Sequence, residues 1–98
     1  METVAFSEDY LEGTVLLFFA GEDCGLCNGM RMKTERVLAD RDLRLMEVDL
    51  AAVPQLRGTF GVFSFPTLLL LQDGRELVRT AGFFDFGPLE KTLDALGL

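Results

Sequence analysis

Hydrophobic and polar residues alternate along the chain in segments that predict strands and helices in turn. The longest apolar run, Val15 to Ala20, contains no polar residue and predicts a central strand buried on both faces. Residues 43–49, 67–71 and 76–80 predict three further strands. Asp73-Gly74 predicts a hairpin turn between the last two, because Gly accepts the positive φ that such turns need.

Helices are predicted between these strands. The longest covers residues 26–38, where one face carries side chains at helical spacing: Cys27, Met30, Thr34 and Val37. The charged residues of this helix are expected to form a solvated face: Arg31, Lys33, Glu35 and Arg36. Shorter helices are predicted over residues 7–12 and 53–60, and the last begins at Pro88.

The order of these elements predicts the topology. Because a helix joins the first two strands, they should be parallel, with a right-handed crossover. The fold class is therefore α/β, with a mixed sheet of about four strands and helices on both faces.

Composition and charge narrow the class of protein. The chain has 98 residues, which is the size of one domain, and we expect residues 1–98 to form it. Its net charge of −7 disfavours binding to nucleic acid and to anionic lipid. No apolar run approaches the roughly 20 residues that span a bilayer, and the N-terminus does not have the pattern of a signal peptide. We expect a cytoplasmic protein without a membrane segment, with prior removal of a leader as an open alternative.

The two cysteines, Cys24 and Cys27, lie between the buried strand and the long helix. Taken alone, a C-x-x-C motif fits half of a metal site as well as it fits a redox pair. A structural zinc site usually needs four protein ligands, and this chain has no histidine and no second cysteine pair. We therefore expect no metal site within one chain and no cofactor. A dimer that shares a metal or an iron–sulfur centre through two such pairs stays an open alternative.

Redox chemistry gives each cysteine a role. Three positions of separation at a helix start bring the two sulfurs within bonding range. Cys24 would lie at the helix N-terminus, where free N–H groups and the helix dipole favour a thiolate. Cys27 would lie one turn further on and face the core. Cys24 is thus the predicted nucleophile and Cys27 the predicted resolving thiol.

Pro66 supports the same chemistry. It stands in Phe65-Pro66-Thr67, at the mouth of an apolar strand, where the missing N–H marks a strand end or a special bond. A proline in that place is most often trans. Its combination with the C-x-x-C motif favours a cis bond instead.

Over nearly its whole length the chain resembles the thioredoxin family. The resemblance is carried by the apolar strand, Cys24-Gly25-Leu26-Cys27, Phe65-Pro66-Thr67, the Asp73-Gly74 hairpin and Gly82. It implies a thioredoxin fold and a protein-disulfide oxidoreductase. The spacing from Pro66 to Gly82 is similar to that of thioredoxins rather than glutaredoxins.

The resemblance also implies which residues contact a substrate. In the family the proline that matches Pro66 is cis and lies against the dithiol, and the backbone of the residue before it, here Phe65, pairs with the substrate chain. Gly82 and Phe83 complete the implied substrate-binding residues. The implied partners are proteins with disulfides or thiols, together with an upstream reductant, either a thioredoxin-reductase-like protein or a small thiol. We expect the protein to be a monomer.

Departures from the family pattern favour a second hypothesis. Asp23 replaces the usual Trp before the first cysteine, and Leu26 replaces the Pro before the second. Phe18 stands where the family has a buried carboxylate, and Leu45 where that carboxylate has its lysine partner. The usual internal proton acceptor is therefore missing. The alternative is an adaptor or binding module that keeps the fold with weak redox turnover.

Aromatic residues gather near Pro66 and Gly82. We expect Phe60 to pack in the core. Phe65, Phe83 and Phe84 are expected to form an exposed apolar rim around the dithiol that binds extended segments of partner proteins.

Overall fold

The computed structural model describes residues 2–3 and 11–98. The predicted helix over residues 7–12 lies outside these residues, apart from Leu11 and Glu12. The elements follow one another as β1 (Glu2–Thr3), β2 (Thr14–Ala20), α1 (Gly25–Val37), β3 (Arg44–Asp49), α2 (Leu56–Phe60), β4 (Thr67–Gln72), β5 (Arg75–Ala81) and α3 (Phe86–Ala95).

The strands form one mixed sheet in the order β1-β3-β2-β4-β5. As predicted, β2 and β3 are parallel, and β4 and β5 form an antiparallel hairpin. Asp73 and Gly74 join that hairpin with φ values of 49° and 82°, the positive values that its turn requires. The four longer strands match the predicted four. The fifth, β1, pairs two residues with β3 and is too short to produce a period in the sequence.

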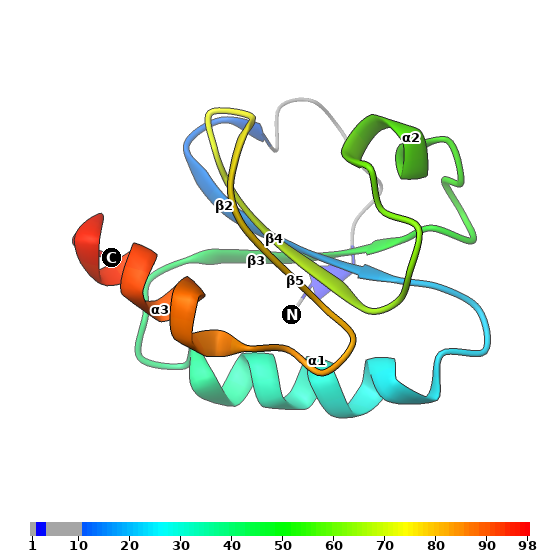
Figure 1. Ribbon diagram of the computed structural model, residues 1–98, viewed down its shortest axis with the longest axis horizontal. Coiled ribbons are helices and arrows are strands. Elements are labelled where there is room, and N and C mark those ends of the chain that lie inside the picture. The colour runs from blue at the N-terminus through cyan, green and yellow to red at the C-terminus, as the bar shows by residue number, and fades with distance from the viewer. Residues whose placement is uncertain (1, 4–10) are drawn as a thin grey trace.

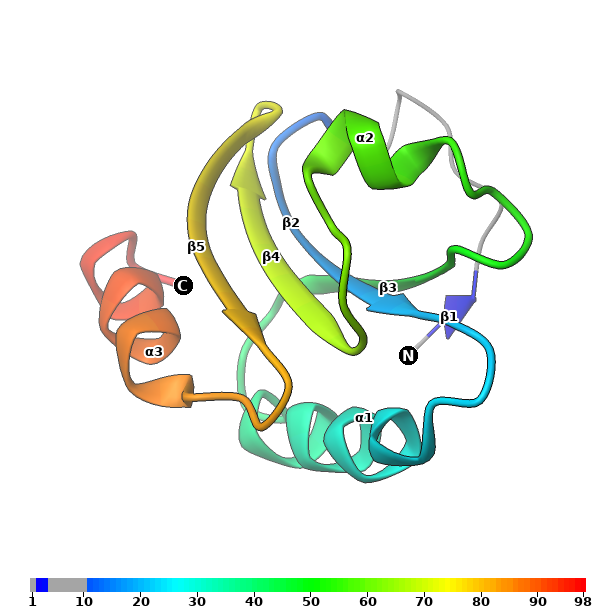
Figure 2. The ribbon, with the colours of Figure 1, turned by 45° about the vertical axis from the view of Figure 1, so that its right-hand side comes forward.

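The helices cover both faces of the sheet (Figures 1 and 2). Leu16 and Phe18 of β2 pack into a cluster with residues of α1 and α3. Leu17 and Phe19 point the other way, into a cluster that includes Leu56 of α2. Successive residues of β2 thus enter two different cores, which explains why this strand has no polar position from residue 15 to residue 20.

Helix α1 places its apolar face on the sheet. Cys27, Met30 and Thr34 are buried, as their spacing predicts. Thr34 has no exposed surface, and its hydroxyl donates to the Met30 carbonyl oxygen at 2.6 Å. Since Cys24 is the N-cap residue, the first cysteine lies directly at the helix N-terminus.

Helix α1 is shifted by one residue from the prediction, and two other helix boundaries differ by more than that. The helix predicted over residues 53–60 is confined to Leu56–Phe60, and turns occupy the residues before it. The last helix begins at Phe86, two residues before Pro88, because Asp85 caps it by accepting from the Gly87 N–H at 3.1 Å. Among the described residues, the structure has no helix of the length and apolarity needed to cross a membrane.

Candidate active site

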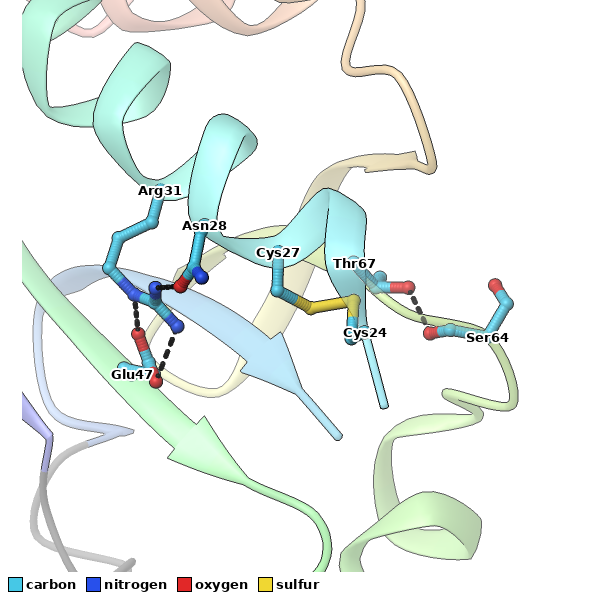
Figure 3. Close-up of a disulfide and its surroundings, with 7 residues drawn as sticks. All are labelled: Cys24, Cys27, Asn28, Arg31, Glu47, Ser64 and Thr67. Carbon is cyan, nitrogen blue, oxygen red and sulfur yellow. Dashed lines mark hydrogen bonds and ion pairs between the residues drawn. A yellow bond between two sulfur atoms is a disulfide. The ribbon is translucent and has the colours of Figure 1, made fainter. Parts of the chain in front are cut away.

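The two cysteines lie at the start of α1, directly after the loop that follows β2. They form a disulfide with an S–S distance of 2.05 Å and a Cα–Cα distance of 5.3 Å (Figure 3). Cys27 is 3% exposed and packs in the core, whereas Cys24 is only partly buried. Cys24 is therefore the more exposed residue of the two.

The loop before Cys24 is shaped by close packing and by an unusual backbone conformation. A Cβ atom at Gly21 would clash with the Phe65 ring, so only glycine allows this ring to rest on the loop. Asp23 has a φ of 53°, a left-handed conformation that Asp tolerates better than most residues. Glu22 and Asp23 are both exposed, which leaves the entrance to the dithiol acidic.

The segment from Ser64 to Thr67 lies beside the disulfide (Figure 3), and its Phe65 packs against the core cluster that Cys24 also contacts. The Phe65–Pro66 peptide bond is cis. The Thr67 hydroxyl donates to the Ser64 carbonyl oxygen at 2.9 Å and fixes the turn. The Gly82 N–H donates to the Pro66 carbonyl oxygen at 2.9 Å, which holds the end of β5 against this segment. Phe65, Pro66 and Gly82, named from the sequence, thus lie together.

The predicted aromatic rim needs one correction. Phe83 is 81% exposed, Phe63 is 75% exposed and Phe65 is partly buried. Phe84 is expected in this rim from the sequence, but it is 6% exposed and packs edge-on against the Phe18 ring, with 5.8 Å between the ring centroids. The reason is that Phe84 follows the bend after β5, where its N–H donates to the Met30 sulfur at 3.4 Å and its ring also packs edge-on against Phe86, so Phe84 faces the core.

Phe60 packs in the core, as predicted. It is partly buried against the cluster that includes Phe19, with 5.4 Å between the two ring centroids.

A paired arginine lies on the α1 side of the dithiol. The Arg31 guanidinium donates to both carboxylate oxygens of Glu47 on β3, and also to the Asn28 side-chain oxygen at 2.6 Å (Figure 3). The hydrogen bonds to Glu47 are the main cause that raises the pKa of Arg31. The guanidinium also lies 5.5 Å from the centre of the Phe18 ring. The expectation that Arg31 belongs to a solvated helix face is therefore wrong, because its side chain reaches back to the sheet.

Glu47 and Arg57 were not identified from the sequence. Glu47 is 9% exposed and pairs in register with Phe18, so a carboxylate lies next to the position where the family resemblance implies one. The sequence feature that could have identified Glu47 is a charged residue between two apolar ones, Met46 and Val48, in a predicted strand. Arg57, on α2, lies over the Phe65 ring with 5.1 Å to its centre. No pattern in the sequence connects Arg57 to the dithiol.

Metal ligands do not gather anywhere in the part of the chain that the structure describes. That part contains no cluster of three or more His, Cys, Asp or Glu side chains that could hold a metal ion. The two sulfurs at this site are bonded to each other.

Comparison with known proteins establishes the family. The thioredoxin family profile matches residues 2–95. The thioredoxin of Chlamydia muridarum is 34% identical over 89 residues, which cover 90% of this chain and 87% of that protein. The thioredoxin of Listeria monocytogenes is 36% identical over 91 residues, which cover 91% and 88%. The chain belongs to the thioredoxin family.

Solved structures agree with that assignment. A mutant thioredoxin from Halobacterium salinarum superposes with a TM-score of 0.80 over 96% of this chain and 88% of that one, at 23% identity, which shows the shared fold. A thioredoxin-like protein from Bacillus cereus has a TM-score of 0.69 at 30% identity, over 86% and 88% of the two chains. With the Cys24–Cys27 pair, this thioredoxin-family chain is a thiol–disulfide oxidoreductase.

Proposed function

We propose that Cys24 is the nucleophile and Cys27 the resolving thiol in disulfide exchange with protein partners. The observation that carries this proposal is the unequal exposure of two bonded cysteine residues at one helix start. Cys24 is partly exposed at the N-terminus of a 13-residue helix, while Cys27 is 3% exposed. A helix N-terminus stabilises a nearby thiolate, so the more exposed cysteine is also the one that the helix favours as an anion.

The exchange balances in two steps. The Cys24 thiolate attacks one sulfur of a substrate disulfide, which forms a mixed disulfide and releases the other substrate sulfur as a thiolate. The Cys27 sulfur, after losing its proton, attacks Cys24 and releases the second substrate sulfur. The substrate gains two electrons and the protein loses two, so the observed Cys24–Cys27 disulfide is the product state. A reductant, either a reductase protein or a small thiol, must then return the pair to the dithiol.

The proton of Cys27 leaves by an external route. Phe18 is fully buried and cannot accept a proton. The carboxylate that pairs in register with Phe18 on the neighbouring strand, Glu47, receives two hydrogen bonds from Arg31 and is held in an ion pair. We therefore assign the acceptor role to the departing substrate thiolate or to water at the Cys24 entrance.

Substrate chains bind across the surface beside the dithiol. Phe65, Pro66 and Gly82 lie together there, and Phe83 adds an exposed aromatic side chain next to Gly82. Exposed and partly exposed aromatic side chains at the end of a strand suit an extended polypeptide better than a small molecule. We further propose that residues 1–98 act as one monomeric domain in the cytoplasm.

Trapping tests the two roles directly. Cys27→Ser should accumulate a mixed disulfide with a disulfide-bonded test protein, because the resolving sulfur is gone. Cys24→Ser should accumulate little, because the remaining sulfur is buried. Non-reducing electrophoresis and intact mass measure the adducts. Equal trapping by both variants would contradict the assignment of the nucleophile.

A second measurement separates the enzyme from an adaptor with weak turnover. The wild-type protein is equilibrated in graded thiol–disulfide buffers, and free thiols are alkylated and counted by mass. A potential near about −270 mV favours reduction of partners, and one tens of millivolts higher favours oxidation or isomerisation. A protein that never forms the intramolecular disulfide in these buffers would act as an adaptor.

A further inference from the structure

A cavity opens on the α2 side of the dithiol. Its volume is about 340 Å³. Four of its lining residues are of apolar type and two are charged: Leu50, Ala51, Pro54, Phe65, Glu22 and Arg57. Phe65 connects this cavity to the reacting sulfurs, because it precedes Pro66 and packs against the same core cluster as Cys24. A group held in the cavity would therefore belong to a chain that is already beside the disulfide.

Arg57 is the unusual side chain in this cavity. Its Nε atom is buried and has no hydrogen-bond partner. Its guanidinium rests on the Phe65 ring and makes no ion pair with any residue that the structure describes. Three other arginines do have carboxylate partners within the chain: Arg31, Arg41 and Arg79. A buried donor without a partner costs free energy, so its persistence needs a reason.

The backbone holds Arg57 firmly in this place. Its N–H donates to the Pro54 carbonyl oxygen at 3.1 Å, and its own carbonyl oxygen accepts from the Val62 N–H at 2.9 Å. The ring of Phe65 beneath the guanidinium is in turn held against Gly21. The cation is thus positioned before any partner arrives, which lowers the entropic cost of binding an anion.

We infer that Arg57 and this cavity form a specificity pocket for an acidic side chain, Asp or Glu, that lies close to the reactive cysteine of a protein partner. The inference rests on the proposed function, since it assumes that a polypeptide lies across Phe65. A carboxylate would supply the partner that the guanidinium does not have, in a fork geometry that arginine favours. The Phe65 ring beneath the guanidinium holds the cation in place for this interaction. Glu22, on the rim, opposes it and sets an upper limit on the preference.

The protein's overall charge disfavours acidic peptides, so a preference for them identifies the pocket. With a net charge of −7, the chain as a whole repels acidic peptides. Glu22 and Asp23 add to that repulsion at the entrance. A preference for an acidic peptide can therefore not come from the general field, and must come from a local cation.

The test uses three peptide disulfides that differ only in the residues flanking the reactive cysteine: glutamate, glutamine or lysine. The full-length reduced protein reacts with each at fixed ionic strength, and thiol release gives the rate constant. For every variant the rate with the glutamate peptide is divided by the rate with the glutamine peptide. We expect a ratio of about three to ten for the wild type, the size of one partly exposed charge-assisted interaction.

Three variants locate the preference. Arg57→Gln should bring the ratio to one or below, and should make the lysine peptide the fastest, because Glu22 and Asp23 then dominate. Arg57→Lys should keep part of the preference, since it keeps the charge and loses the fork. Arg75→Gln is the matched control, with the same change in charge at the exposed hairpin end of β5, and should keep the wild-type ratio.

The outcomes separate this inference from the proposed function. Reaction with the glutamine peptide reports on disulfide exchange itself, so its absence in the wild type would reject the proposed function. A wild-type ratio of one, or a ratio that survives in Arg57→Gln, would overturn the pocket while exchange remains. If Arg57→Gln does not fold, the pocket is tested by the wild-type ratio and by that of Arg57→Lys, and an unchanged ratio in Arg57→Lys would overturn it.

Discussion

Arg31 and Arg57 lie on opposite faces of the sheet, one on α1 and one on α2, and each rests on a phenylalanine ring. Arg31 lies over Phe18 and is held by both oxygens of Glu47, whereas Arg57 lies over Phe65 and has a buried Nε without a partner. Two arginines near the same dithiol can therefore have different roles. The satisfied one stabilises the fold, and the unsatisfied one is free to bind a partner.

Replacing the phenylalanine ring beneath each arginine should give the largest difference in stability between the two sides. Phe18→Ala removes a fully buried side chain and should destabilise the protein by about 3–5 kcal/mol. Phe65→Ala, at a partly buried ring on the surface that faces the substrate, should cost clearly less. Equilibrium unfolding in denaturant, with the disulfide intact in both variants, measures the difference. Equal losses of unfolding free energy in the two variants would mean that both rings contribute equally to the stability of the fold.

The Arg31–Glu47 pair should give the next largest effect. Glu47→Gln leaves Arg31 with a neutral partner in a half-buried place and should cost about 2 kcal/mol. Since the pKa of Arg31 is raised in the folded protein, the stabilisation is present below the ordinary guanidinium pKa and is lost only as the pH rises through the higher folded value. The loss should therefore be the same when denaturation is measured at neutral and at moderately alkaline pH.

Glu22→Gln is the matched control for that variant. Glu22 is exposed and has no ion pair among residues 2–3 and 11–98, so its change should stay within about 0.5 kcal/mol. A loss as large as that of Glu47→Gln would mean that Glu22 also stabilises the fold, and would remove the contrast between the two sides of the dithiol.

Gly21→Ala tests how tightly the α2 side is assembled. The added methyl would clash with the Phe65 ring, which must rotate or shift, and this should cost about 1 kcal/mol, the lower end for overpacking. Because the ring also supports Arg57, the preference for the glutamate peptide should fall as well. Thermal unfolding and the peptide rate ratio are measured on the same preparation. Gly29→Ala, where a Cβ meets nothing within 4 Å, is the control.

Arg57→Gln should have the smallest effect on stability and the largest on selectivity. It loses the contact with Phe65 but also removes a buried donor without a partner, so the two contributions nearly cancel, within about 0.5 kcal/mol. Denaturant unfolding measures this change. A loss as large as that of Glu47→Gln would show that Arg57 is structural, and would place both arginines in the same class.

The order of the elements and the chemistry of the dithiol could be predicted from the sequence alone. A fully apolar run at residues 15–20, a C-x-x-C motif before an amphipathic helix and an Asp-Gly turn are local signals, because each depends on neighbours within a few positions. The same local spacing predicted that Cys27 is buried and Cys24 more accessible, as the structure has it.

Which side chains meet around that dithiol depends on tertiary packing. The pairing of Arg31 with Glu47 joins residues 16 positions apart, and the burial of Phe84 depends on its contact with Phe18. β1 is defined by its pairing with β3, because a strand of two residues is too short to show a periodic pattern in the sequence. Arg57 comes to lie on Phe65 through the path of α2 across the sheet. Long-range contacts of this kind depend on how the layers pack, and packing is a property of the whole fold rather than of any segment.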